Sequence, residues 1–462
     1  MKIKIQNLGV LKQAEFTLAD LTIICGGNNT GKTYATYALF GFLSTWKRML
    51  TIDINDRIQE LLAEGVIRID IQEYIEQTQK IVTKGCQKYT KQLPNIFAAA
   101  PERLKKTKFD IIVDINDINL NRKFGGKISL PSGELFSFTK NDDSTELVVT
   151  LLVEQEKVKI PTEILQLVIA ETLKEIIFSQ LFPKPFIASA ERTGAAIFRK
   201  ELNFARNRLL EEIGQADYKI DPRELLFKGY QDYPLPVEQN VEFTRELETI
   251  SKKRSFLYNE HPEVLNDFAD IIGGEYTVTS NDELYYTPKQ GKRPPKLSMV
   301  ESSSAVRSLL DIGFYLKHEA QPGDLLMVDE PELNLHPENQ RRIARLFARL
   351  INLGIKVFIT THSDYIIKEL NTLIMLNQDK PHLKRIAEEE GYQTEELISA
   401  EKIKVYIAEE KSIQLEGNKR KTKSLTLTLA NIDQEMGIEA RSFDTTIEEM
   451  NRIQEAIVWG ED

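Results

Sequence analysis

One short segment constrains this chain more than any other: a glycine-rich loop between an apolar strand and a helix. Residues 21–25, LTIIC, are almost wholly apolar and predict a buried strand. Residues 26–33, GGNNTGKT, match the pattern GxxxxGK[ST] in full, and residues with helical spacing follow them. This pattern binds phosphates when it stands between a strand and a helix, so the sequence predicts an α/β fold built around a phosphate-binding loop.

The residue types in this loop suit a nucleoside triphosphate with Mg²⁺. Glycines let the backbone N–H groups turn toward phosphates, Lys32 supplies a positive charge for the β- and γ-phosphates, and Thr33 offers a hydroxyl to the metal. A chance glycine turn is the alternative, which the flanking elements disfavour. The predicted cofactors are ATP and Mg²⁺, and the predicted nucleotide-binding residues of the loop are Gly26, Gly27, Asn28, Asn29, Thr30, Gly31, Lys32 and Thr33.

A second apolar strand ends in two neighbouring carboxylates. Residues 325–331, LLMVDEP, have the arrangement of a Walker B element, which typically accompanies a phosphate-binding loop. We expect Asp329 to hold Mg²⁺ through its water shell and Glu330 to take a proton from the attacking water. Successive strand residues point to opposite faces, but at a strand end both side chains can reach one site. A buried strand followed by an ordinary acidic turn is the alternative.

Two further segments carry candidate polar groups. Residues 356–363, KVFITTHS, predict a third apolar strand whose end places His362 where an imidazole can contact a γ-phosphate or the attacking water. Upstream, Ser303 and Ser304 stand just before an amphipathic helix. Serine at this position is typical of a helix N-cap, and because the same N–H groups form an anion site, capping and phosphate binding are compatible interpretations.

Composition narrows the class of protein. Among 462 residues, 41% are hydrophobic and 28% charged, which is typical of globular proteins. The formal net charge of −10 opposes nonspecific phosphate binding over the whole surface, although local basic grooves remain compatible with it. No window predicts a membrane span, and the first residues, MKIKIQ, do not predict a secretion signal. Cys25 and Cys86 lack the number and spacing of a disulfide framework, and we expect a cytoplasmic protein with no membrane partner.

The rest of the chain predicts insertions between core elements. Amphipathic helical patterns and short strand-like runs alternate without a repeat of fixed period. The expected divisions are an N-terminal ATPase lobe with the phosphate loop at 1–44, a helical and β-rich insertion at 45–183, a core strand at 184–194, a helical insertion at 195–272, an ATPase lobe with the serine cluster, Walker B and His362 at 273–375, and a C-terminal packing or partner-docking region at 376–462.

The motifs, taken in order, resemble a known family. The phosphate loop, the serine cluster, DEPELNLHP at 329–337 and THS at 361–363 look like an ABC-type ATPase of the RecF, SMC and OLD-like group. Within that group, ERTG at 191–194 and YPLP at 233–236 resemble the ATPases of bacterial anti-phage systems. The PARIS ATPase subunit is the most similar, and Septu and retron-associated ATPases are close alternatives.

The resemblance implies a head with a mixed β-sheet core, helical insertions and a small β-rich lobe, two copies of which sandwich ATP. Ser303 and Ser304 of one copy would then cap the γ-phosphate bound by Lys32 of the other, in a homodimer or higher homo-oligomer. Ser304 and Ala305 stand where the LSGG signature of such ATPases has glycines. Gln13 lies too early for their glutamine loop. Glu191 and Arg192, at a predicted strand end, are candidates for a role nearby, and a salt-bridged strand end is the alternative.

The leading hypothesis for function is an ATPase that acts as a sensor, scaffold or switch in anti-phage defence. The region after Ser363 contains no DxD pair for metal, so we expect no intrinsic nuclease. The resemblance implies that a separate effector, a TOPRIM-type nuclease, is controlled by this chain and that a phage-encoded protein is the trigger. Residues 438–457 predict an amphipathic helix for packing or partner docking.

The alternative hypothesis is a DNA-repair or chromosome-maintenance ATPase that binds duplex DNA directly. Basic residues form three sequence clusters that could line a groove, and solvated loops and helix faces are the other interpretation. The clusters are residues 289–296, then Arg199, Lys200, Arg206 and Arg208, then Lys252, Lys253 and Arg254. A transporter subunit is disfavoured, because large insertions separate the phosphate loop from the serine cluster.

Overall fold

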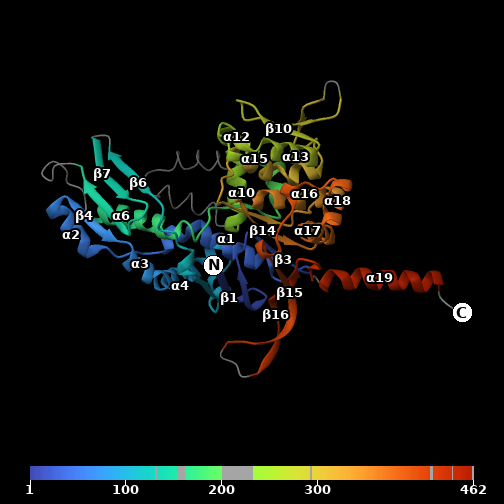
Figure 1. Cartoon of the computed structure of the whole chain (residues 1–462), viewed down its shortest axis with the longest axis horizontal. Helices are drawn as coiled ribbons and strands as arrows, with labels where there is room; N and C mark the ends of the chain where they lie inside the picture. Colours follow the sequence, from blue (N-terminus) through green and yellow to red (C-terminus); the bar gives the residue numbers. More distant parts are fainter. Residues whose placement is uncertain are drawn as a thin grey trace, which may run out of the picture. The chain divides into compact units, whose positions relative to one another are not determined.

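The computed structural model describes residues 1–130, 133–152, 162–199, 233–291, 294–416, 420–439 and 441–459. Contacts divide the chain into two compact units (Figure 1). Unit 1 comprises Met1–Lys4, Phe42–Gln92 and Lys108–Pro183, and unit 2 comprises Ile5–Gly41, Leu93–Thr107 and Lys184–Asp462. Every residue that the sequence predicts for the site therefore belongs to unit 2.

A six-stranded mixed sheet forms the centre of unit 2. Its order is β16 (Lys421–Leu429), β15 (Ile403–Gln414), β3 (Leu21–Cys25), β14 (Lys356–Thr361), β13 (Leu325–Asp329) and β9 (Pro185–Ala188). The strands from β15 to β9 run parallel, whereas β16 is antiparallel to β15. Every residue of β3 and β13 is buried, as expected for parallel strands that are covered on both faces.

The strand order brings three distant segments of the chain to one edge of the sheet. The register pairs Asp329 of β13 with Thr360 of β14, and Thr361 of β14 with Cys25 of β3. In a parallel sheet, the segments that follow the strands all leave at the same edge. The loop after Cys25, the turn after Asp329 and the turn after Thr361 therefore meet there.

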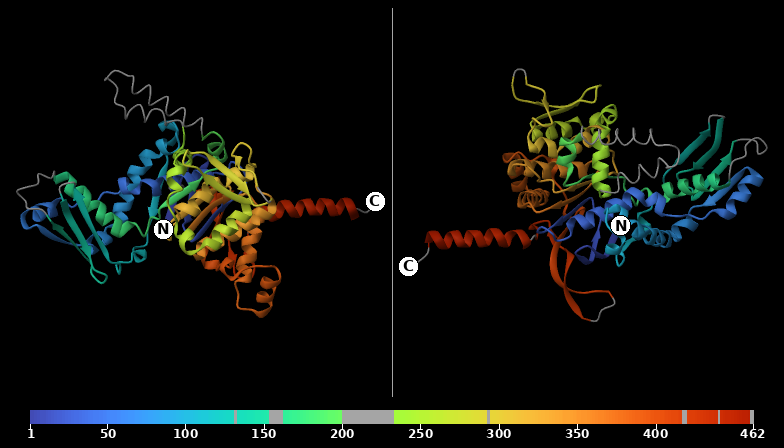
Figure 2. Two further views of the ribbon diagram at one scale, coloured as in Figure 1. Left: turned by 90° about the horizontal axis from the view of Figure 1, so that it is seen from above. Right: turned by 180° about the vertical axis from the view of Figure 1, so that it is seen from behind.

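Helices join these strands, and Figure 2 shows them around the sheet in two further views. The spacing of apolar residues explains how they pack: Ile343, Leu346, Phe347 and Leu350 form one buried face of α16. Among the described residues, the helices that begin in unit 2 are α1 (Lys32–Met49), α5 (Pro101–Leu104), α7 (Arg192–Ile197), α10 (Leu235–Arg245), α11 (Leu247–Ile250), α12 (Phe256–Glu260), α13 (Pro262–Ile272), α14 (Ser304–Ser308), α15 (Leu310–His318), α16 (Pro337–Asn352), α17 (Asp364–Leu376), α18 (Pro381–Glu389) and α19 (Arg441–Trp459).

Smaller elements complete unit 2. Strands β10 (Gly274–Val278), β11 (Leu284–Pro288) and β12 (Leu297–Ser298) form an antiparallel sheet, and β17 (Ile432–Asp433) pairs with β18 (Gly437–Ile438). Strand β1 (Lys2–Leu8) begins in unit 1 and ends in unit 2, and a tight turn joins it to its neighbour β2 (Leu11–Thr17). The 3₁₀ turns η2 (Thr394–Glu396) and η3 (Ala400–Lys402) lead into β15.

Unit 1 is built on an antiparallel four-stranded sheet. Its order is β4 (Val66–Asp70), β8 (Glu146–Leu151), β7 (Gly133–Lys140) and β6 (Phe124–Leu130). Besides β1, the other described elements that begin in unit 1 are α2 (Asn55–Glu64), α3 (Gln72–Glu76), α4 (Thr78–Ile96), β5 (Lys108–Ile112), η1 (Ile115–Asp117) and α6 (Thr162–Phe178). In β8, buried and exposed positions alternate at the start of the strand, which is the pattern of a sheet with one covered face.

The fold class expected from the sequence is confirmed: the chain is α/β, with a mixed core sheet, helical insertions and a small β-rich sheet. The expected division into segments stays a prediction, and the core sheet bears on its last segment. The segment 376–462 was expected to lie outside the ATPase lobes, whereas β15 from this segment lies beside β3 in the core sheet. Much of the helical insertion expected at 195–272 lies outside the described residues.

The last helix carries apolar side chains that are exposed. In α19, every side chain described from residue 449 to residue 459 is exposed. The large apolar ones are Met450, Ile453, Ile457, Val458 and Trp459, with exposed fractions from 45% to 79%. Separately, the described part of the chain contains no helix with the length and apolarity needed to span a membrane.

Candidate nucleotide site

Glycines shape the loop that follows β3. Gly26 has a φ of +142°, and a Cβ atom there would lie 2.6 Å from the carbonyl oxygen of Ala408 in β15. Gly31 has a φ of +95°, and its Cβ would lie 2.7 Å from the side chain of Leu11. Both positions require glycine, because an added Cβ would meet backbone or packed side chain and because the φ values disfavour other residues.

The lysine of the loop is ordered by the loop itself. Lys32 is 6% exposed, and its Nζ donates to the carbonyl oxygens of Gly26 at 2.9 Å and Gly27 at 2.8 Å. Thr33 is exposed in the first turn of α1, and that turn contains no acidic residue. The N-terminus of this 18-residue helix therefore presents free N–H groups and a positive dipole end beside a buried ammonium group.

The middle of the loop faces outward. Asn28 and Asn29 are exposed, and Asn29 adopts a φ of +62°. The hydroxyl of Thr30 donates to the Gly27 carbonyl at 2.8 Å, which closes the loop on itself. The structure thus brings all eight predicted loop residues into one turn at the edge of the sheet.

Asp329 lies at the end of β13 and is 2% exposed. Its Oδ1 accepts a hydrogen bond from the hydroxyl of Thr360, whereas its buried Oδ2 has no partner. Burial raises the pKa of Asp329 to about 6, and the neighbouring Glu330 carboxylate also raises it, while the bond from Thr360 lowers it. The unpartnered carboxylate oxygen of Asp329 and the exposed hydroxyl of Thr33 belong to segments that meet at the same edge of the sheet. Together they are a set of oxygen ligands that suits Mg²⁺.

Glu330 is held in a sparsely populated backbone conformation. Its φ is +51°, and its N–H donates to the carbonyl oxygen of Thr360 at 3.1 Å. Its own carbonyl oxygen accepts from Nη2 of Arg192 at 2.9 Å. The side chain is 25% exposed, so the carboxylate remains open to water while the backbone on both sides is fixed.

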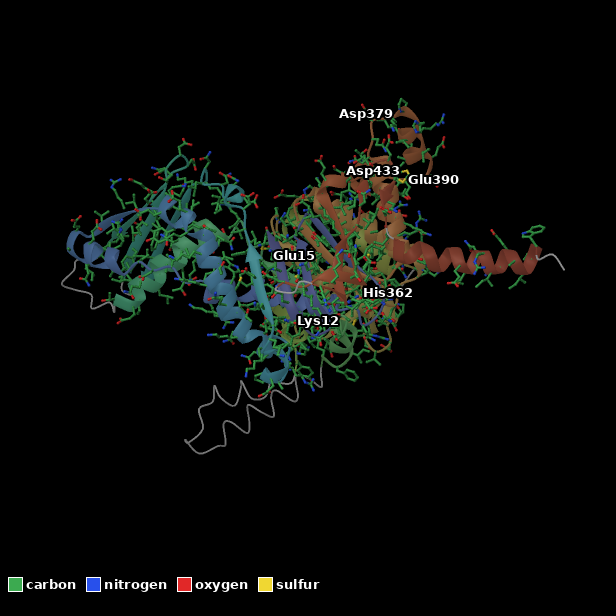
Figure 3. All side chains as sticks on the ribbon, turned by 90° about the horizontal axis from the view of Figure 1, so that it is seen from below. Lys12, Glu15, His362, Asp379, Glu390 and Asp433 are labelled. Atoms are coloured by element: carbon green, nitrogen blue, oxygen red, sulfur yellow. The ribbon has the colours of Figure 1, made fainter. Side chains whose placement is uncertain are left out.

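His362 follows β14 and lies beside this carboxylate. Its Nδ1 is 3.6 Å from Oε1 of Glu330 and 3.4 Å from Oε1 of Glu332, and the side chain is 45% exposed. Figure 3 labels His362 within unit 2. The structure therefore brings Glu330 and His362 together, as their positions at two strand ends predict.

Glu332 contributes to the site although the sequence analysis gave it no role. It is 7% exposed, and its Oε1 accepts from the Thr361 hydroxyl at 2.9 Å and from the His362 N–H at 2.8 Å. Its Oε2 is buried without a partner. The signal for Glu332 in the sequence was its place in the run DEPELNLHP at 329–337. Its role in fixing the turn after β14 depends on which strands are neighbours, and no local sequence pattern shows that.

Arg192 and Glu191 approach the carboxylates from β9. Arg192 is 1% exposed and donates to backbone carbonyl oxygens, including that of Asp329 at 2.7 Å, so the interpretation as a salt-bridged strand end is wrong for this residue. Glu191 accepts at 3.1 Å from the hydroxyl of Tyr37 in α1. Burial raises the pKa of Tyr37, and the Glu191 carboxylate raises it further, so the phenol stays protonated and joins α1 to the β9 turn.

The serine cluster caps a short helix. Ser303 is the N-cap of α14 and accepts from the N–H of Val306 at 3.3 Å, and Ser304 accepts from Nη2 of Arg307 at 3.2 Å. Both serines are exposed. Their hydrogen bonds stay within this helix and its lead-in, and within one chain neither serine bonds to a residue of the phosphate loop. At the other end of α14, Ser308 donates to the Leu333 carbonyl at 3.0 Å.

A cavity of about 760 Å³ lies beside the start of α1. Tyr34, which follows Thr33, lines it together with Gly9 and Lys12, and its ring packs against Phe97 with 5.5 Å between centroids. Arg103, Lys105 and Lys106 also line it. The cavity therefore combines aromatic rings with basic side chains next to the phosphate loop.

The match to a known family agrees with this geometry. Residues 1–367 match the family model described as AAA ATPase domain, and the match includes the phosphate loop, both carboxylates and His362. The chain belongs to this family. It is thus an AAA ATPase domain protein, and the expectation of an ATPase is confirmed at that level. The finer resemblance to anti-phage systems, PARIS among them, stays a prediction.

Solved structures similar to this AAA ATPase include heads of SMC proteins. An SMC head bound to the C-terminal winged-helix domain of ScpA is 12% identical over 92% of this chain and 97% of that chain, with a TM-score of 0.32. An Smc head with an extended coiled coil, bound to the C-terminal domain of ScpA and derived from Pyrococcus furiosus, is 12% identical over 98% of each chain, with a TM-score of 0.31. The SMC head from Thermotoga maritima is 12% identical over 80% and 90%, with a TM-score of 0.27. No curated protein matches the chain.

Proposed function

We propose that this AAA ATPase binds ATP with Mg²⁺ at the edge of the core sheet and hydrolyses it to ADP and phosphate. The observation that carries the proposal is the register of β3, β14 and β13, which brings the Lys32 loop, His362 and the Asp329–Glu330 pair to one edge. Phosphate ligands, a metal-binding carboxylate and an open carboxylate near an imidazole are the parts that phosphoryl transfer to water needs.

Thr33 and Asp329 would hold the Mg²⁺. The orphaned Oδ2 of Asp329 supports this, because a buried carboxylate oxygen without a partner is costly unless a cation or a donor satisfies it. Bound Mg²⁺ would neutralise charge on the phosphate oxygens. Among the described residues no group of three or more His, Cys, Asp or Glu forms a metal cluster, which is compatible with Mg²⁺ because it keeps several waters and few protein ligands.

The loop residues bind and orient the triphosphate. Lys32 would exchange its two carbonyl partners, Gly26 and Gly27, for phosphate oxygens, while the N–H groups at the start of α1 bind the same charge. Tyr34 and Phe97 offer aromatic surface for the nucleoside end in the adjoining cavity. We assign the nucleobase of ATP to this cavity, because the cavity adjoins the turn of α1 whose N–H groups would bind the phosphates.

Glu330 is the general base in this proposal. It takes a proton from a water molecule, the water oxygen bonds to the γ-phosphorus, and the bond from that phosphorus to the terminal oxygen of ADP breaks. The partly exposed carboxylate and the fixed backbone support this role. His362 orients the carboxylate or the water from its place 3.6 Å away.

Two copies of the chain would complete the site. We propose a homodimer, or a higher homo-oligomer, in which Ser303 and Ser304 of one copy meet the γ-phosphate bound to the other. The exposure of both serines on a capped helix supports the proposal. The hydrogen bond from Ser308 of the same helix to Leu333 would connect this contact between copies to the Walker B turn.

In the cell, we propose, this ATPase switches a separate effector in anti-phage defence. The resemblance of residues 191–194 and 233–236 to defence ATPases supports a TOPRIM-type nuclease as effector and a phage-encoded protein as trigger. The exposed apolar face of α19, with Met450, Ile453 and Ile457, is the surface that we assign to effector docking. Such a protein acts in the cytoplasm.

Direct binding of duplex DNA has less support. Arg199 is 5% exposed and pairs with Asp282, so it belongs to no surface groove. Lys252, Lys253 and Lys289 also have carboxylate partners, namely Glu248, Glu319 and Asp270. Lys200, Arg206, Arg208, Lys292 and Arg293 lie outside the described residues. DNA affinity that falls steeply with salt, and that is lost on charge reversal at Lys292 and Arg293, would revive this alternative.

The proposal is tested by ATP binding and phosphate release in matched variants. Lys32→Ala should abolish measurable release and weaken ATP binding at least about 10-fold, because it removes the buried ammonium group. Lys384→Ala removes an exposed lysine that pairs with Asp379 and should change neither quantity. Equal phosphate release by wild type and Lys32→Ala would show that the activity does not come from this site.

A further inference from the structure

Arg192 is a buried cation whose four side-chain hydrogen bonds all go to backbone carbonyl oxygens. Its Nε donates to the Ser308 carbonyl at 2.6 Å, and its Nη1 donates to those of Ser189 at 2.8 Å and Asp329 at 2.7 Å. Its Nη2 donates to the Glu330 carbonyl at 2.9 Å. One guanidinium group thus joins the turn after β9, the end of β13 and the end of α14.

The cost of this arrangement indicates a role beyond stability. Burial lowers the pKa of Arg192, and the nearby carboxylates of Asp311, Asp329, Glu332 and Glu330 raise it. A buried charge is seldom the most stabilising choice for its volume, since well-packed apolar residues often serve as well. What an arginine does provide is a planar fork of donors in fixed directions.

The fork meets the backbone at a strained point. Glu330 adopts a φ of +51°, with its N–H bound to Thr360 on one side and its carbonyl bound to Arg192 on the other. Arg192 also binds the carbonyl of Asp329. The peptide groups that carry both catalytic carboxylates are therefore tied to one side chain.

The same side chain reaches the helix that begins at the serine cluster. Helix α14 has only five residues, so Ser308 is one short helix away from Ser303 and Ser304. The Ser308 carbonyl accepts from Arg192, and the Ser308 hydroxyl lies 3.0 Å from two carbonyl oxygens, that of Ala305 within α14 and that of Leu333 in the Walker B turn. A continuous series of hydrogen bonds therefore joins α14 to the backbone of Glu330 through Arg192.

We propose that Arg192 is a positioning residue that couples the serine surface of α14 to the carboxylate of Glu330. It sets the position of the base without contacting the nucleotide. The inference rests on the proposed ATPase function and adds a route by which the second copy of the chain controls hydrolysis.

Arg192→Lys is the first test, because a lysine keeps the charge but cannot donate in three fixed directions. The experiment measures kcat and KM for phosphate release, the affinity for ATP, and the melting temperature. We expect kcat to fall at least about 10-fold with KM and ATP affinity within about twofold of wild type, because a displaced base lowers the rate and leaves ground-state binding intact.

Arg349→Lys is the matched control. Arg349 is 6% exposed and pairs with Asp267, so it is a buried arginine of the same unit that touches none of the site residues. This variant should lower the melting temperature and leave kcat unchanged. Equal kcat values for Arg192→Lys and Arg349→Lys would overturn the proposal.

Ser308→Ala tests the same coupling without changing a charge, and it decides the matter if Arg192→Lys does not fold. It removes the bond to Leu333 and should lower kcat several-fold at constant ATP affinity, while a wild-type kcat would contradict the coupling. Failure of the proposed ATPase function can be distinguished from failure of the coupling through Arg192. If the wild-type protein releases no phosphate, the proposed function itself fails, whereas an active wild type with equally active Arg192→Lys and Ser308→Ala variants overturns this inference alone.

Discussion

At the scale of single residues, the site combines groups whose roles their chemistry dictates with groups whose roles only tertiary contacts reveal. Lys32, Asp329 and Glu330 could be predicted from the sequence because phosphate and metal binding restrict residue type and spacing. From the sequence, Arg192 was a candidate only for an unspecified role nearby and Glu332 had no predicted role, because a buried arginine or glutamate looks like any other in a sequence. Their contacts with backbone atoms depend on which strands are neighbours.

Asp311 provides a test of the buried electrostatics around Arg192. It is 1% exposed, its Oδ1 accepts from the Thr244 hydroxyl at 3.3 Å, and burial raises its pKa to about 7, although Arg192 lowers it. In an unfolded chain the pKa of aspartate is about 3.9, so the folded state binds this proton more tightly. The contribution to stability is full below about pH 4 and is lost as pH rises through about 7.

Asp311→Asn should therefore exceed wild type in stability by a larger margin at pH 8 than at pH 5, since asparagine resembles the protonated acid. The measurement is the difference in free energy of unfolding between the two proteins at each pH. Asp329 is present in both proteins, and its own raised pKa cancels in the difference. The same stability difference at pH 5 and pH 8 would show that Asp311 is already ionised in the folded protein at pH 5.

At the scale of elements, the phosphate loop and helix α14 offer paired tests. Gly26→Ala places a Cβ 2.6 Å from the Ala408 carbonyl at a φ of +142°, so it should cost about 1–3 kcal/mol of stability. Gly27→Ala meets only the Thr30 side chain at 4.0 Å and should change stability by less than about 1 kcal/mol. Denaturant unfolding of the two variants measures this contrast, which equal losses would contradict.

Ser303 separates capping from phosphate contact. Ser303→Ala removes the bond from the Val306 N–H and should cost about 1 kcal/mol. Ser303→Asp keeps a capping oxygen, so its stability should stay near wild type, but its charge should repel the γ-phosphate of the other copy and weaken ATP-dependent dimerisation. Thermal unfolding and sedimentation with ATP measure the two effects. An aspartate variant that dimerises as wild type does would place this residue away from the phosphate.

The strand order shows where prediction from sequence stops. The apolar runs of β3, β13 and β14 could be recognised because buried parallel strands are continuously hydrophobic. The place of β15 beside β3 could not, because its second half is polar and its pairing joins residues far apart in the chain. This omission did not affect the predicted site residues. Strand β15 lies against the phosphate loop at Ala408 and supplies none of the predicted ligands.

At the scale of the whole molecule, we propose that one chain forms half of an active ATPase. One copy brings together the phosphate loop, the carboxylates and His362, while its serine cluster caps its own helix and makes no hydrogen bond to that loop. Completion of the site by a second copy is thus the central claim. Arg192 and Ser308 would then couple contact with the second copy to the position of Glu330, the proposed general base.

The most direct test is the mass in solution of wild-type and Glu330→Gln protein, with and without ATP and Mg²⁺, alongside phosphate release. Loss of the base should leave ATP bound but unhydrolysed, so the variant should form a dimer that requires ATP and persists, while wild type forms it briefly. Hydrolysis by Glu330→Gln at the wild-type rate would contradict the assignment of the base. A mass that ignores nucleotide in both proteins would contradict the shared site.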